Sequence, residues 1–115
     1  MGKQWYSDLS DDDAKAYEDS VNRIKKGVEQ DMSFEQAVSL ISVEDKNLKA
    51  AIVDDALKLL IAEMHFVARQ SIDEVVRKLR LPTEVVSKAR QEMINSVENA
   101  AIEAYKESQG QQGNA

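Results

Sequence analysis

The sequence predicts an all-α protein, a compact bundle of about five helices, and three observations lead to this fold class. One Pro and four Gly among 115 residues leave β-strands without the turn residues that usually connect them. A Ser followed three residues later by Asp, Glu or Gln, a pattern typical of a capped helix start, marks four expected starts. Apolar residues then recur at spacings of three and four, as they do on one face of a helix.

The expected helices cover about residues 11–30, 34–41, 43–69, 72–80 and 84–107, and the four capped starts pair Ser10 with Asp13, Ser33 with Gln36, Ser42 with Asp45, and Ser71 with Glu74. We expect residues 1–108 to form a single helical domain. Residues 109–115 are polar and contain two of the four Gly residues, so we expect a disordered tail there.

The first expected helix, 11–30, is amphipathic. Tyr17, Val21, Ile24 and Val28 follow one another at spacings of four, three and four along one face. Three Asp residues, 11–13, fall in the first turn, where the positive end of the helix dipole stabilises carboxylates. We therefore interpret them as helix-stabilising groups rather than as a metal site or a DNA-mimicking surface. The second helix, 34–41, is short and adds apolar side chains to the core.

The third expected helix, 43–69, is apolar around nearly its whole circumference from Ala56 onward. A helix of this kind is buried, either at the centre of a domain or across a subunit interface. Because the other helices of so small a chain can cover only part of that circumference, we expect a homodimer. The residues expected to mediate self-association are Leu57, Leu59, Leu60, Ile61, Met64 and Phe66.

The fourth and fifth helices, 72–80 and 84–107, lie on either side of Pro82. The fourth begins at the Ser71 cap, and Pro82 separates the two because proline cannot continue a helix. The fifth carries an apolar side that ends in alanines, which allow another helix to approach closely. Its apolar residues are Val86, Ala89, Met93, Val97, Ala100, Ala101 and Ala104.

The charges are distributed unevenly. The net charge of −6 argues against indiscriminate binding to nucleic acid or to anionic membranes, both of which require clustered Lys and Arg. Residues 69–90 are the exception, because six basic side chains stand there against three acidic ones.

No constellation of residues predicts catalysis. His65 is the only His and there is no Cys, so neither a zinc triad nor a thiolate metal site can form within one chain. Most Ser residues fall at helix starts, where capping explains them, and no phosphate-binding glycine loop or nucleophile elbow is present. We expect a protein that is not an enzyme, with no catalytic residues, metal, cofactor or small-molecule substrate.

Residues 71–91, SIDEVVRKLRLPTEVVSKARQ, resemble the helix-turn-helix motif of DNA-binding proteins. Six apolar positions agree with that motif, namely Ile72, Val75, Leu79, Leu81, Val86 and Ala89. Two positions depart from it, because Val76 replaces a small residue and Arg80 replaces a turn residue that is often Gly with positive φ. These departures, together with Pro82, predict a wider turn.

The resemblance implies a DNA-binding surface. Thr83, Glu84, Ser87, Lys88 and Gln91 would face the bases, and Arg77, Lys78, Arg80 and Arg90 would lie near phosphates. The alternative interpretation of residues 71–91 is an ordinary helical hairpin whose basic groups form a solvated face.

Two functions follow as expectations. The first is a small non-enzymatic helical protein that acts through protein–protein interaction or self-assembly, with itself or with another protein as its partner. The alternative is a helix-turn-helix transcriptional regulator that binds double-stranded DNA through residues 71–91. No segment is apolar over the length that a bilayer requires and there is no Cys, so we expect a cytoplasmic protein without a membrane partner.

Overall fold

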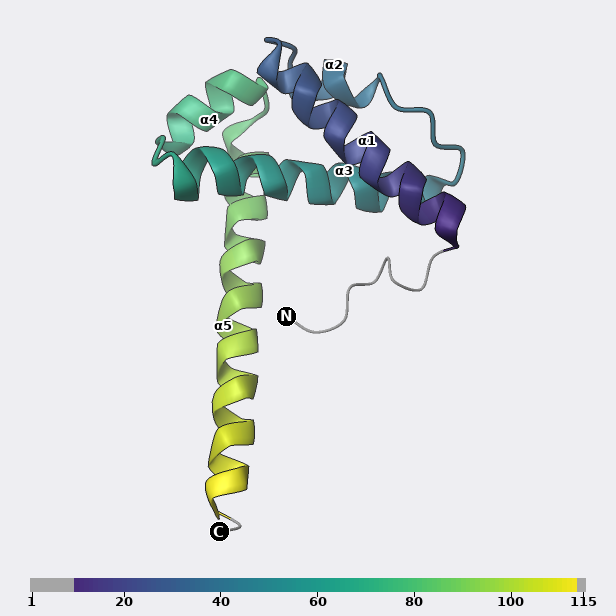
Figure 1. Cartoon of the computed structure of the whole chain (residues 1–115). Coiled ribbons are helices and arrows are strands. Elements are labelled where there is room, and N and C mark those ends of the chain that lie inside the picture. The colour runs from purple at the N-terminus through teal and green to yellow at the C-terminus, as the bar shows by residue number, and fades with distance from the viewer. Residues whose placement is uncertain (1–9, 114–115) are drawn as a thin grey trace.

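The computed structural model describes residues 10–113, with side chains described as far as residue 107. Within these residues every regular element is helical, which confirms the all-α fold class. The elements are α1 (Asp11–Glu29), α2 (Phe34–Val38), α3 (Lys46–Ile61), the π-helical segment η2 (Ala62–Val67), α4 (Ile72–Leu79) and α5 (Thr83–Gly113). Figure 1 shows α1 to α4 gathered at one end of α5, whose remaining length projects away as an arm.

Three of the four expected caps are confirmed. The side chains of Ser10, Ser33 and Ser71 each accept a hydrogen bond from the backbone N–H three residues later, and the latter two form complete capping boxes. The prediction at Ser42 is wrong. Asp45 caps α3 instead, because its Oδ1 accepts from the backbone N–H groups of Asn47 at 2.9 Å and Leu48 at 3.0 Å.

This cap explains why two predicted boundaries are wrong. The predicted helix 34–41 ends at Val38, and the chain from there to Asp45 is irregular, so the predicted helix 43–69 begins only at residue 46. That helix also changes character before its end. Its last part, η2, is π-helical, and Arg69 follows it with a left-handed φ of 60°.

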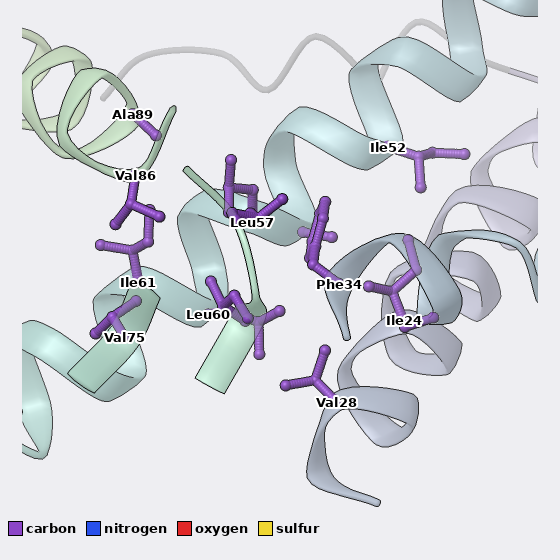
Figure 2. Packing of buried hydrophobic residues seen from close by; sticks show 14 of the residues in the cluster. Ile24, Val28, Phe34, Ile52, Leu57, Leu60, Ile61, Val75, Val86 and Ala89 are labelled. Carbon is purple, nitrogen blue, oxygen red and sulfur yellow. The ribbon is translucent and has the colours of Figure 1, made fainter. Parts of the chain in front are cut away.

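The core lies where α1, α2 and α3 meet and continues to the α4–α5 turn (Figure 2). Ile24, Ile52 and Ile61 are each completely buried. Gly27 allows α2 to pack closely on α1, because a Cβ atom at Gly27 would lie only 2.9 Å from the Cβ of Ala37. At full burial, Ile24, Ile52 and Ile61 each stabilise the folded state by about 1.5 to 3 kcal/mol. The packing where the helices meet therefore holds the fold together.

Helix α5 has two parts with different surroundings. Val86 and Ala89 near its start are buried against the other helices, whereas Val97 is 70% exposed and Tyr105 is 65% exposed. The helix continues to Gly113, beyond the end near residue 107 that the sequence predicts and into the expected tail. The last two residues of that tail, 114–115, lie outside the described part of the chain.

Candidate nucleic-acid interface

The segment that resembles a helix-turn-helix begins with the capping box of α4. Glu74 Oε1 accepts a hydrogen bond from the backbone N–H of Ser71 at 3.0 Å, and Ser71 Oγ accepts one from the N–H of Glu74 at 3.1 Å. The bond from the Ser71 backbone, with a further contribution from the Ser71 side chain, lowers the pKa of Glu74. The carboxylate is therefore ionised at neutral pH, and the box weakens only as acid protonates it.

The turn after α4 is tight rather than wide. Arg80 adopts the left-handed conformation, with φ 57° and ψ 44°, and donates its backbone N–H to Val76 O at 2.8 Å. Only residues 80–82 separate the two helices. The predicted wider turn is thus wrong, because Arg80 takes the backbone conformation for which the motif ordinarily uses Gly.

Five of the six apolar positions that match the motif are buried. Val75, Leu79 and Val86 are completely inaccessible, and Leu81 and Ala89 are at most 9% exposed. Ile72 is half-buried and packs against the same core cluster. These side chains hold α4 and the start of α5 on the end of α3, and Figure 2 shows Val75 and Val86 in the same cluster as Ile61.

The five residues for which the resemblance implies base contacts are all exposed, and they are Thr83, Glu84, Ser87, Lys88 and Gln91. At 3.6 residues per turn they share one side of α5, opposite the buried Val86 and Ala89. On this side of α5, Gln91 Nε2 donates a hydrogen bond to Oδ1 of Asn95, on the same helix, at 3.0 Å. The start of α5 therefore presents a polar face to the solvent.

The four cations implied to lie near phosphates have different surroundings. Arg77 and Arg80 are exposed. Lys78 is half-buried and its Nζ lies 3.1 Å from Oδ1 of Asp31, the residue with a φ of 72° beyond the end of α1. This surface ion pair contributes roughly 0 to 1 kcal/mol to stability. Asp31 would therefore compete only weakly with a ligand for Lys78.

Arg90 packs within the protein, a role that the sequence did not indicate. Its Nε donates to Nε2 of His65 at 2.9 Å, and its guanidinium lies 6.0 Å from the centroid of the Phe66 ring. Because Nε2 accepts this bond, the His65 proton belongs on Nδ1, which donates to Gln70 O at 2.8 Å. The chain of bonds joins η2, the loop before α4, and α5.

The residues expected to mediate self-association divide into two groups. Leu57, Leu60 and Ile61 are at most 8% exposed and belong to the chain's own core. Leu59 and Phe66 are 38% and 46% exposed, and Met64 is half-buried. A partner could therefore reach only the second group without unfolding the domain.

An apolar groove of about 360 Å³ lies where η2 meets the arm of α5, and it is lined by Phe66, Met93, Ile94, Val97 and Glu98. The sequence placed Met93 and Val97 on the apolar side of the fifth helix. It did not indicate that the other helices end beside them, because that depends on the angle at which α5 leaves the bundle (Figure 1).

Metal-binding groups and membrane-spanning helices are both absent from the described part of the chain. Residues 10–107 contain no group of three or more His, Asp or Glu side chains placed to hold a metal ion. None of the helices in the described range combines the length and apolar character needed to cross a bilayer.

The left-handed Arg80 leads to a stability prediction. Replacing Arg80 by Gly removes the clash of its Cβ atom, and after allowance for the more flexible unfolded chain we expect a gain of about 0.5 to 1 kcal/mol. Arg77→Gly, inside α4, is the matched control and should lose about 1 kcal/mol. Urea unfolding of both variants measures the difference, and equal losses would show that residue 80 does not require a left-handed backbone.

Comparisons with models of protein families, with curated proteins and with solved structures find no match. The function must therefore be inferred from the residues of this chain.

Proposed function

We propose that this protein binds double-stranded DNA through a helix-turn-helix formed by residues 71–91. The observation that carries the proposal is the tight turn, in which Arg80 is left-handed and the apolar side chains on both sides of it are buried. A sequence that merely alternates basic and apolar residues need not produce this turn. The turn sets α4 across the start of α5, the arrangement in which a second helix can enter the major groove.

In this proposal the exposed face at the start of α5 reads the bases. Lys88 suits guanine O6 and N7, Gln91 suits adenine N6 and N7, and Glu84 can accept from the amino group of cytosine. Arg77 and Arg80 contact phosphates beside the groove, because both are exposed and lie on α4 and its turn. Arg90 is omitted from this surface, since His65 and Phe66 engage it.

The net charge of −6 weakens general electrostatic attraction between this protein and DNA. Most of the chain repels DNA, so affinity depends on a few contacts around α4 and the start of α5. Binding should fall as salt rises, because each phosphate contact releases a counterion. The expected cytoplasmic location is kept as part of this proposal.

Fluorescence anisotropy tests the proposal, first with random-sequence duplex DNA at low and moderate salt and then with a sequence selected from that pool. We expect Arg77→Ala and Lys88→Ala each to weaken binding to the selected sequence about tenfold. Both positions are exposed and helical, so alanine leaves the fold intact.

Lys106→Ala is the matched control for the DNA test. It removes the same charge from an exposed position of α5, but in the arm, far from the proposed groove contacts. Its affinity should stay within about twofold of that of the unaltered protein. If Lys106→Ala weakens binding as much as Lys88→Ala, or if no DNA binds at low salt, the proposal is wrong.

A protein–protein interaction module without DNA binding is the second candidate. It is favoured by the exposed apolar side chains beside the groove, among them Phe66, Val67 and Val97. Under this second function the anisotropy would not change with DNA, and the protein would still form a stable complex with itself or with another protein.

A further inference from the structure

An apolar groove of about 510 Å³ runs along α3 and is lined by Lys46, Lys49, Ala50, Val53, Asp54 and Leu57. Ala50, Val53 and Leu57 follow one another at spacings of three and four, so they share one face of the helix and form the floor of the groove. Asp55, which accepts a hydrogen bond from Tyr17 of α1, lies two positions from both Val53 and Leu57. That spacing puts it on the opposite side of α3. The groove therefore opens away from α1.

We propose that residues 1–9 of this chain, which lie outside the described part, dock in the groove through Trp5 and Tyr6. This segment reads MGKQWYSDL and contains the only Trp of the sequence. Trp and Tyr have the largest apolar surfaces to bury, and each keeps a polar group that can stay at the solvent edge of a groove. The volume of the groove is within the range of sites that hold a ligand-sized group.

Two contacts between α1 and α3 place the start of α1 beside this groove. Tyr17 Oη donates to Oδ2 of Asp55 at 2.5 Å, and Lys25 Nζ lies 2.8 Å from Oε2 of Glu63. The residues of each pair are 38 positions apart, so the two helices run in the same direction, and Figure 1 shows both beginning at the same end of the bundle. The same offset puts Ser10 at the level of the first turn of α3.

The segment is long enough to reach the groove. Trp5 stands five residues before Ser10, and five extended residues span up to about 17 Å. A helix with its side chains is about 10 to 12 Å across, so the chain can pass from Ser10 around α3. Because the segment is tethered beside the groove, its effective concentration there is on the order of millimolar. This advantage favours it over an aromatic group of a second copy or of another protein.

The charges at the rim of the groove suit the same occupant. Asp54 is paired with Lys58 at 3.0 Å, so Lys46 and Lys49 set the sign of the rim. An ammonium group is attracted to the face of a Trp or Tyr ring. The segment also brings Asp8, two residues before Ser10, as an anion for this positive rim.

Fluorescence of the full chain tests the docking directly, because Trp5 is the only Trp. We expect emission at a shorter wavelength than in the urea-unfolded protein, and protection from acrylamide, a neutral quencher that the lysines do not attract. Both properties should stay constant on dilution, since the occupant belongs to the same chain. Emission and quenching equal to those in urea would overturn the proposal. Protection that is lost on dilution would also overturn it, because a second copy would then supply the contact.

A pair of variants shows whether Trp5 lies in this groove or elsewhere. Ala50→Glu fills the floor of the groove with a longer side chain whose carboxylate resists burial, so emission and quenching should shift to the values found in urea. Asn47→Glu adds the same side chain to the same helix outside the groove and should change neither property. Both positions are exposed, and circular dichroism checks that both variants keep their helices. No shift in Ala50→Glu, or equal shifts in the two variants, would overturn the proposal. None of these measurements involves DNA, so this inference and the proposed function can fail independently.

Discussion

Replacing Leu79 by Ala is expected to lower the free energy of unfolding by about 3 kcal/mol, within the range for a fully buried Leu. Leu79 is the last residue of α4, is completely buried, and belongs to the core that joins α4 and α5 to α3. Alanine would leave a cavity at the point where the turn begins. Thermal or urea unfolding followed by circular dichroism measures the loss.

Val85→Ala is the control for the Leu79 prediction. Val85 lies nearby on α5 but is 41% exposed, so its truncation removes little buried surface and should change stability by less than about 0.5 kcal/mol. If Leu79→Ala is as mild as Val85→Ala, the turn is not held by the buried core. The same result would remove the main support for the helix-turn-helix.

The sequence predicted helix starts best where a Ser and its partner side chain were the only local choice. Ser33 with Gln36 and Ser71 with Glu74 form the expected boxes. At Ser42 two capping residues competed, and Asp45 prevailed because its carboxylate reaches two backbone N–H groups while the preceding residues remain irregular. A local sequence pattern does not show which of two neighbouring capping residues will form the cap.

The candidate site was predictable to the extent that it depends on helical periodicity. That periodicity correctly separated the buried Val86 from the exposed Lys88 on α5. The surroundings of the cations were not predictable, because Arg90 meets His65 and Lys78 meets Asp31 across long separations in the chain. Such contacts depend on how the helices cross, and several bundle arrangements satisfy the same apolar stripes.

The arm shows a further limit of the same reasoning. The apolar side of α5 is continuous in the sequence, and a continuous stripe predicts burial along its whole length. In the single chain the burial stops near Met93, because the helices on the other side are too short to follow. The apolar stripe predicts that some other surface packs on this side of α5. Only the structure shows that the chain's own helices cover it no further than about Met93.

Selection from random duplex DNA is expected to enrich one short sequence that the exposed start of α5 reads. Lys88→Ala should bind that sequence about tenfold more weakly and should lose part of the preference over random DNA, because Lys88 is exposed on the face proposed to contact bases. Anisotropy with the selected and the random duplex measures both quantities. If DNA bound at low salt but selection enriched no sequence, the exposed face would contact phosphates alone and would not read bases.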